Sequence, residues 1–256
     1  MTGTSETFDS HLRSWHAWQR SPWGRLRYRT VENTLLRSLP DCPSRILDVG
    51  GGDGTDAIAL ARAGHDVTVL DFSEPLLGAA RNAAQLAGVA GRVHTVHADL
   101  DDVPGADFDA VLCHNLLQYR TDPVGSVAQL VALTRVGGVL SLIAGNPASD
   151  VLAAAVRRLD LSEALELLDA ATARTVTFDQ YVRRLEASDI ATALEANGCH
   201  VLHRFGIRCI ADFITDDGLK ADPEFYARLE QLELAVCDRE PFVHTARMWQ
   251  LVAARG

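Results

Sequence analysis

Several features are missing from this sequence, and each absence excludes a class of protein. No run approaches the ~18 apolar residues of a membrane span, and the first 16 residues lack the apolar region of a signal peptide. There is no CxxC pair or His/Cys cluster, so neither a disulfide framework nor a metal site is indicated. The five dispersed cysteines are Cys42, Cys113, Cys199, Cys209 and Cys237. We therefore expect reduced thiols, a cytoplasmic location and no membrane partner.

Lysine is almost absent, and positive charge is in deficit. The 256 residues hold 23 arginines and one lysine, Lys220, against 34 acidic residues, which gives a net charge of −10. This balance argues against avid nonspecific binding of nucleic acid, although it leaves room for a local basic patch. Between residues 11 and 40 six arginines stand against Glu32 alone. A solvated helix face and a contact with an anionic group both explain that cluster.

The apolar residues are arranged as strands that alternate with helices. Hydrophobic residues make up 47% of the chain, enough for a folded core. Seven apolar runs predict strands, at 45–50, 65–71, 92–99, 108–114, 137–145, 200–209 and 247–255. Helices are predicted over 54–63, over 74–87 with Ser73 as its cap, and after Asp122-Pro123. This alternation predicts an α/β fold with a doubly wound, mostly parallel seven-stranded sheet.

The same pattern predicts one domain over 1–256, with four parts. An N-terminal helical segment (1–40) has a turn at 21–24 and a helix over 27–39. A ligand-binding core follows over 45–145. A largely helical cap is inserted over 148–197, and the C-terminal strands and helix, the latter over 223–238, lie within 198–256.

A glycine-rich loop is the most informative segment. Residues 48–54 read Asp-Val-Gly-Gly-Gly-Asp-Gly and stand between a predicted strand and a predicted helix. Glycines there allow positive φ angles and close approach of the backbone to a ligand. Thr55 occupies the place where a dinucleotide fingerprint needs a small residue, and Asp48 would repel a pyrophosphate. A ligand with an amino group or a positive centre suits this loop better.

Two further acids end the next two strands. Asp71 can accept hydrogen bonds from both hydroxyls of a ribose. Asp99 can accept one from an adenine amine, with the backbone N–H of Leu100 offered to the ring. Acids at three neighbouring strand ends around a glycine loop describe an adenosine pocket without a phosphate, and S-adenosylmethionine is a common ligand of that kind.

These segments resemble the motif set of the class I S-adenosylmethionine-dependent methyltransferases. The resemblance rests on DVGGGDG, VLDFS, HADLDDVP and RVGGVLSL, in this order over residues 45–145. It implies the Rossmann-like methyltransferase fold, with S-adenosylmethionine as cofactor. The cofactor-binding residues that it implies are Arg27, Asp48, Gly50, Gly51, Gly52, Gly54, Asp71, Phe72, Asp99, Leu100 and His114.

A wider resemblance extends over nearly the whole chain. WGRLR, LCHNLLQY before an Asp-Pro, GGVLSLIAGN, GIRCIADFI and ELAVCDREPFVHTARMW resemble the bacterial tRNA methyltransferases that esterify 5-carboxymethoxyuridine at the wobble position. This resemblance implies O-methylation of a carboxylate on tRNA. The alternative is a methyltransferase of a small-molecule, secondary metabolite. A binding protein without activity is a third reading, which the intact loop and acids disfavour.

Methyl transfer to a carboxylate needs alignment more than acid–base chemistry. A carboxylate is already ionised at pH 7, and proximity and orientation can supply ~7–11 kcal/mol of the barrier reduction. An arginine grips a carboxylate bidentately, so we expect Arg208 and Arg247 to clamp the acceptor, unless they pair with acids such as Glu233 or Glu240.

Three other side chains are candidates for the site. His114 is expected to position the cofactor or to act as a base, unless it is merely packed. Tyr119 is expected to shape the acceptor pocket or to be a core aromatic, and Asn146 to face the crevice or to form a turn. A tRNA enzyme also predicts a positive rim, built from the N-terminal arginines with Arg174, Arg183 and Arg184. A small-molecule enzyme predicts instead an enclosed apolar pocket under the cap.

Overall fold

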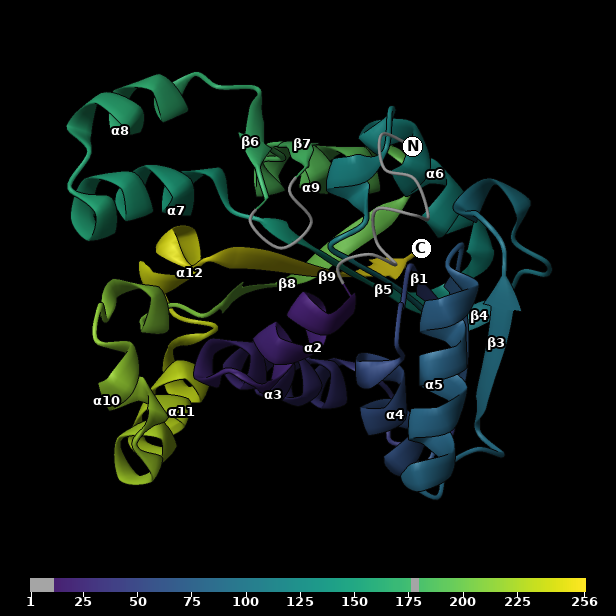
Figure 1. Ribbon diagram of the computed structural model, residues 1–256. Coiled ribbons are helices and arrows are strands. Elements are labelled where there is room, and N and C mark those ends of the chain that lie inside the picture. Colours follow the sequence, from purple (N-terminus) through teal and green to yellow (C-terminus); the bar gives the residue numbers. More distant parts are fainter. Residues whose placement is uncertain (1–11, 176–179) are drawn as a thin grey trace.

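The computed structural model describes residues 12–175 and 180–256, and its centre is a seven-stranded sheet with helices on both faces (Figure 1). The strands are β1 (Arg45–Val49), β2 (Asp66–Asp71), β3 (Val93–His97), β4 (Phe108–His114), β5 (Thr134–Gly145), β8 (Cys199–Ile207) and β9 (Met248–Arg255). Their order is β3-β2-β1-β4-β5-β9-β8. The first five strands are parallel, and β9 is antiparallel to both of its neighbours. The predicted doubly wound, mostly parallel sheet is confirmed.

The sheet separates two hydrophobic cores. The helices that face it are α3 (Pro22–Ser38), α4 (Thr55–Arg62), α5 (Glu74–Leu86), α6 (Pro123–Leu133) and α9 (Ala187–Ala196). Successive side chains of a strand point to opposite faces. In β4, Val111 and Cys113 therefore pack in the core that includes α6 and α9, whereas Ala110 and Leu112 pack in the core with α3, α4 and α5. Burial on both faces explains why the central strands read as continuous apolar runs.

Helix caps explain where several of these elements begin. Ser73 accepts a hydrogen bond from Leu76 N at the start of α5, and Asp122 accepts one from Gly125 N before Pro123 opens α6. Both starts were predicted. The expected turn at 21–24 is wrong, because Ser21 caps a helix in the same way. Since proline is tolerated in the first helical turn, α3 begins at Pro22 rather than at residue 27.

The segment between β5 and α9 forms a separate layer over the carboxyl ends of the strands. It consists of α7 (Pro147–Leu152), the π-helical turn η3 (Ala153–Arg158), α8 (Leu161–Leu168), and the antiparallel pair β6 (Thr172–Arg174) and β7 (Tyr181–Arg183). We call these five elements the cap. The insertion over 148–197 is largely helical, as predicted, but it differs from the prediction in two details. The cap contains this strand pair, and α9 lies outside the cap because it packs against α6, β8 and β9.

Short elements complete the chain at its two ends. At the N-terminal end α2 (Leu12–Arg20) packs on α3. Between β8 and β9 lie η4 (Ala211–Phe213), α10 (Asp217–Ala221), α11 (Pro223–Val236) and α12 (Phe242–Thr245). Of these, α11 was predicted, and it packs against α3. No helix within the described ranges is long and apolar enough to span a bilayer.

Candidate functional site

A cavity of about 580 Å³ opens at the carboxyl ends of β1, β2 and β4. This edge of an open α/β sheet is where such folds bind ligands, and the volume is in the range of small-molecule sites. Its walls come from the glycine loop, α2, α3, the cap, and the segments around η4 and α10. Parts of the chain that are distant in sequence therefore meet around one space.

The glycine loop after β1 has the backbone shape that its sequence predicts. Gly50, Gly52 and Gly54 have φ angles of 71°, 57° and 73°, in the left-handed region that favours glycine. A Cβ on Gly51 would lie 2.5 Å from Asp48 Oδ2. Glycine at 51 is therefore required by the carboxyl group beneath the loop.

Asp48 itself is buried and incompletely bonded. Its exposure is 2%, and Oδ2 has no hydrogen-bond partner in the structure. Burial raises the pKa of Asp48 to about 8, the Asp56 carboxylate adds to the rise, and Arg27 opposes it. Such a group favours a cationic donor that would restore its charged form. The orphaned oxygen and the open loop together fit a ligand with an amino group.

Asp71 ends β2 on the opposite side of the loop. Gly52 N donates to its Oδ2 (3.0 Å), and Ser73 N donates to its Oδ1 (2.9 Å). These two bonds fix the carboxylate toward the cavity, which Phe72 also lines. A carboxylate at this strand end is placed where hydroxyl groups of a ligand in the cavity could reach it.

The expected adenine contacts lie in a narrow recess beside the main cavity. Gly50, Phe72, Asp99 and Leu100 line this recess. Asp99 does not stand open, however, because Arg120 Nη1 lies 2.6 Å from its Oδ1. The sequence analysis had not paired these two residues. If Asp99 accepts a hydrogen bond from a ligand, its carboxylate does so while it is also paired with Arg120.

Arg27 and His114 meet at an acid that the sequence analysis missed. Arg27 Nη1 donates to both oxygens of Asp56, at 2.7 and 2.8 Å, and His114 Nδ1 lies 2.9 Å from Asp56 Oδ2. Burial would raise the pKa of Asp56, but Arg27 and His114 outweigh it and hold that pKa well below its usual range. Asp56 is in the first turn of α4, where an acid is common for dipole reasons alone.

The network continues from His114 across the sheet. Its Nε2 lies 3.0 Å from Ser141 Oγ, which also accepts from Gln250 Nε2 (2.9 Å). Burial lowers the pKa of His114, and this effect outweighs the neighbouring Asp56 carboxylate, which raises it. The ring is therefore neutral at pH 7. Both ring nitrogens have protein partners, which leaves neither to act as a general base. Of the expected roles, positioning is the one that this geometry favours.

Tyr119 lies in the cavity wall, where the short helix η2 (Leu117–Tyr119) follows β4. It is 6% exposed, and burial raises its pKa to about 12. The phenol therefore keeps its proton at neutral pH and can donate or accept a hydrogen bond, but cannot act as a base. Tyr119 is thus a packed aromatic that also borders the cavity, and its role toward an acceptor stays a prediction.

The N-terminal helix α2 is fastened to the glycine loop, which the sequence analysis did not foresee in detail. Gln19 Nε2 donates to Asp53 Oδ2 (2.8 Å) and to Thr55 Oγ1 (3.2 Å). The rings of Trp15 and Trp18 stack with centroids 5.1 Å apart, and both line the cavity. The sequence signal that could have predicted this contact is the group of aromatic and amide side chains at residues 15–19.

The opposite half of the cavity is basic. Its described lining includes seven cationic side chains, which are Arg157, Arg174, Arg183, Arg184, Arg208, Arg247 and Lys220. Three carboxylates stand among them, those of Asp150, Asp212 and Asp217. The half around the glycine loop has the reverse balance, since Asp48, Asp53, Asp56 and Asp71 face Arg27. The lining from the glycine loop, β2 and α4 is therefore mostly acidic, and we call it the acidic end; the lining from the cap, η4, α10 and the segments flanking them is mostly basic, and we call it the basic end.

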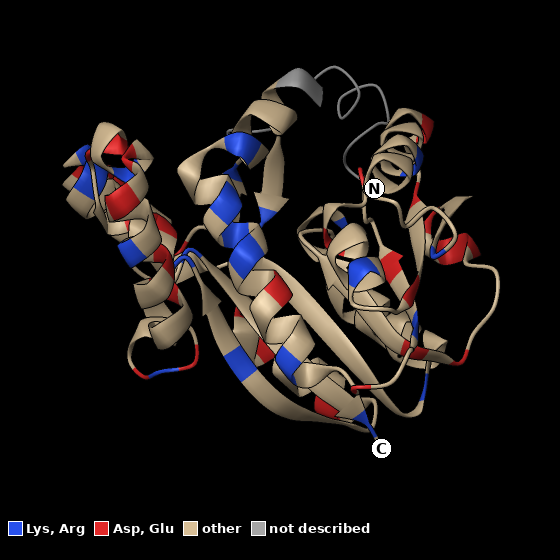
Figure 2. Cartoon of the chain, turned by 90° about the horizontal axis from the view of Figure 1, so that it is seen from below, with Lys and Arg blue, Asp and Glu red and all other residues tan. Residues whose placement is uncertain are grey.

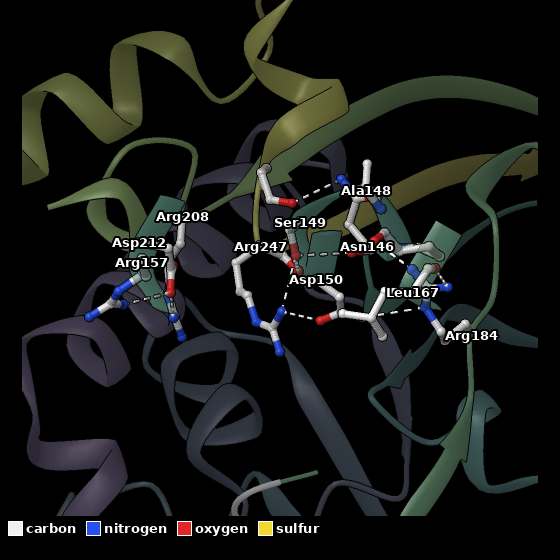
Figure 3. A network of polar contacts seen from close by, with 12 residues as sticks. Asn146, Ala148, Ser149, Asp150, Arg157, Leu167, Arg184, Arg208, Asp212 and Arg247 are labelled. Carbon is white, nitrogen blue, oxygen red and sulfur yellow. Dashed lines mark hydrogen bonds and ion pairs between the residues drawn. The ribbon is translucent and has the colours of Figure 1, made fainter. Parts of the chain in front are cut away.

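The two expected clamp arginines both lie in the basic half, each held by an aspartate (Figure 3). Arg208 donates to both oxygens of Asp212, with 2.7 Å from Nε to Oδ2. Arg247 Nη1 donates to Asp150 Oδ1 (2.5 Å). The partner acids differ from those suggested by the sequence. Glu233 instead accepts from three backbone N–H groups, those of residues 209, 210 and 211.

The remaining predictions for this region are corrected by the structure. Asn146 caps α7, and its Nδ2 donates to the carbonyls of His244 and Ala246, so it has the turn-forming role. Arg184 is not part of a rim, because it donates to the carbonyls of Leu167, Ala170 and Pro147 under the cap. Arg174 and Arg183 are exposed in the cavity wall, as a rim requires.

The described N-terminal arginines lie mostly outside the cavity. Figure 2 shows basic residues following one another along α3 with one acid among them. Arg29 pairs with Glu32, and Arg37 pairs with Asp238. Arg27 alone of those on α3 lines the cavity. The solvated, ion-paired helix face is thus the better description of this cluster.

No group of three or more His, Cys, Asp or Glu side chains within the described ranges is arranged to hold a metal ion.

Comparison with known proteins agrees with this description. Residues 46–138 match the family described as "Methyltransferase domain". The chain is 28% identical over 238 residues to tRNA 5-carboxymethoxyuridine methyltransferase of Escherichia coli K12, covering 91% of this chain and 89% of that protein. It is 34% identical over 145 residues to ubiquinone biosynthesis O-methyltransferase of Methylococcus capsulatus, covering 54% and 59%.

Solved structures show the same fold. Magnesium protoporphyrin IX methyltransferase of Synechocystis PCC 6803, with bound SAH, matches with a TM-score of 0.67 at 17% identity, covering 98% of each chain. A Thermotoga maritima protein described as a SAM-dependent methyltransferase matches with a TM-score of 0.66 at 13% identity, covering 99% of this chain and all of that one.

Proposed function

The chain is an S-adenosylmethionine-dependent methyltransferase, and we propose that it methylates a carboxylate oxygen, with 5-carboxymethoxyuridine of tRNA as the acceptor. The observation that carries this proposal is the division of the cavity by charge. Four aspartates and one arginine stand at the glycine loop, and seven basic side chains with three aspartates stand opposite among the described residues. A cationic methyl donor and an anionic acceptor suit these two ends.

The acidic half supplies the cofactor site. Asp48 would accept from an ammonium group, Asp71 from ribose hydroxyls, and the loop backbone would approach the ligand closely. When bound there, S-adenosylmethionine supplies a methyl group on a sulfonium centre. Arg27 and His114, both held by Asp56, keep the wall beside the loop rigid, so alignment need not be established during the reaction.

The basic half orients the acceptor. Several guanidinium groups line this half, two of them held in place by Asp212 and Asp150, and a planar guanidinium suits the planar carboxylate. An ionised carboxylate needs no general base, in agreement with a neutral, fully bonded His114 and a protonated Tyr119. Formation of the ester removes the negative charge, which weakens the hold of the arginines and favours release.

The choice of tRNA rests on the likeness to the E. coli enzyme over 91% of the chain. The exposed Arg174 and Arg183 in the cavity wall also favour an acceptor with a phosphate backbone. A small-molecule acceptor is the second candidate, supported by the 34% identity to a ubiquinone biosynthesis O-methyltransferase and by the cap over the cavity.

Methyl-labelled S-adenosylmethionine separates the two candidates. The purified protein is offered tRNA from an E. coli strain that lacks its 5-carboxymethoxyuridine methyltransferase and, in parallel, a metabolite extract. We expect label on tRNA that mild alkali removes, because methyl esters hydrolyse. The G51A variant, whose added methyl group would collide with Asp48, controls for contaminating activity. Label in the extract alone would replace the tRNA proposal with the small-molecule one.

A further inference from the structure

Arg157 differs from the other basic residues of the cavity. It lies in the π-helical turn η3 and lines the cavity, with 29% of its side chain exposed. Its Nη1 lies 3.8 Å from Asp212 Oδ1, and its Nη2 lies 3.9 Å from Asp217 Oδ1. Within the described part of the chain, the side chain of Arg157 makes no hydrogen bond. Its guanidinium thus lies within ion-pair distance of two carboxylates but is hydrogen-bonded to neither.

The two carboxylates near Arg157 already pair with other cations of the protein. Arg208 occupies both oxygens of Asp212. Lys220 Nζ lies 2.6 Å from Asp217 Oδ1, and this lysine is 1% exposed, under the ring of Trp23. Each carboxylate therefore already has a cationic partner that lies closer than Arg157.

The charges along this wall do not balance. Among the described residues, three cations (Arg208, Arg157 and Lys220) lie within ion-pair distance of only two carboxylates there. An uncompensated guanidinium with unused N–H groups is the arrangement that a bidentate carboxylate completes. Figure 3 shows Arg157 beside the Arg208–Asp212 pair, with Arg247 across from it.

The backbone that presents Arg157 is also unusual. Residues 153–158 form a π-helical turn, a rare geometry that is frequent at functional sites. The turn ends at Leu159, which has a φ of 56°, a region that residues with a Cβ rarely adopt. The chain thus departs from regular helix where the side chain enters the cavity.

We infer that Arg157 is the arginine that grips the acceptor carboxylate, and that Arg208 and Arg247 are positioning residues held by Asp212 and Asp150. This inference rests on the proposed carboxyl methylation. It assigns specificity for an anionic acceptor to the cap rather than to the C-terminal strands.

The test compares R157Q and R157K with R158Q. Arg158 is the adjacent residue, pairs with Glu163 at 2.7 Å, and does not line the cavity. With tRNA from the E. coli strain described above, R157Q should raise KM for tRNA by about 10- to 100-fold, as loss of a charged hydrogen bond predicts. R157K should recover part of the loss, R158Q should equal the wild type, and the Kd for S-adenosylhomocysteine should stay unchanged in all three.

A second readout separates recognition from folding. The nucleoside 5-carboxymethoxyuridine and its methyl ester are compared as competitive inhibitors. The wild type should bind the acid better than the ester, and R157Q should bind the two nearly equally. If R157Q keeps the wild-type preference and KM while R208Q loses them, the assignment to Arg157 is overturned and the function stands. If the wild type neither methylates this tRNA nor prefers the acid, both proposals fail.

Discussion

Replacing Asp48 with asparagine should raise the stability of the protein and weaken its hold on the cofactor. The buried carboxyl group has a pKa of about 8, against 3.8 as its ordinary value, chiefly because of burial. The native protein therefore keeps a proton that the unfolded chain releases above pH 4. The unfolding free energy falls as the pH rises from about 4 to about 8, and it is constant above that with respect to this group.

The magnitude follows from the same difference. At pH 7 the carboxyl group of Asp48 ionises in the unfolded chain, where the pH lies about three units above its pKa of 3.8. Ionisation stabilises the unfolded chain by about 4 kcal/mol, at 1.36 kcal/mol per unit. Asparagine is neutral in both states and avoids this cost. Allowing for relaxation around the site, we expect D48N to be more stable by about 2–4 kcal/mol at pH 7. For a chain of this size that raises Tm by about 4–16 °C.

Thermal unfolding of both proteins between pH 4.5 and 8.5, without ligand, is the assay. The gap in Tm should be small at the acidic end and should widen to a maximum near pH 8. Calorimetry should show an S-adenosylhomocysteine affinity about 10- to 100-fold lower for D48N, because a charged hydrogen bond to the amino group is lost. A D48N protein with the wild-type Tm at every pH would refute the reasoning about this buried acid.

Three other predictions follow from the site. G51A should abolish cofactor binding, since its Cβ would lie 2.5 Å from a carboxyl oxygen, whereas G91A, where no atom lies within 4 Å of the added Cβ, should bind normally in the same titration. D56N should lower the unfolding free energy by about 3–5 kcal/mol in urea titrations, because the buried Arg27 loses its partner; an unchanged midpoint would contradict this. At saturating cofactor, kcat for a carboxylate acceptor should vary less than about twofold between pH 6.5 and 8.5, because burial lowers the pKa of His114. A bell-shaped profile centred near pH 7 would restore His114 as a general base.

The sheet and the shape of the glycine loop could be predicted from the sequence because their signals are local. Each central strand is an apolar run, and the glycine loop and Asp71 stand at strand ends, which a parallel sheet brings to one edge. The strand order and the cap pair β6–β7 were beyond such reasoning. Strands of three residues leave almost no periodic pattern to read.

The basic end of the cavity was harder to predict because it depends on contacts between distant segments. Arg157, Lys220 and Arg247 come from the cap, from α10 and from the residue before β9, and nothing in the local sequence shows that they share a wall. Asp56 looked like an ordinary acid in a first helical turn, although it joins Arg27 to His114. Lys220 is the one lysine in a chain that has 23 arginines. This rarity could have marked it as a site residue, since it is buried and lines the cavity.

Complementation tests the central claim most directly. The chain is expressed in an E. coli strain that lacks its tRNA 5-carboxymethoxyuridine methyltransferase, and the tRNA nucleosides are analysed by mass spectrometry, with G51A as the inactive control. The account predicts that the methyl ester of 5-carboxymethoxyuridine reappears with the wild-type chain and not with G51A. Soluble wild-type protein that binds S-adenosylhomocysteine and yet leaves the unesterified nucleoside unchanged would contradict it.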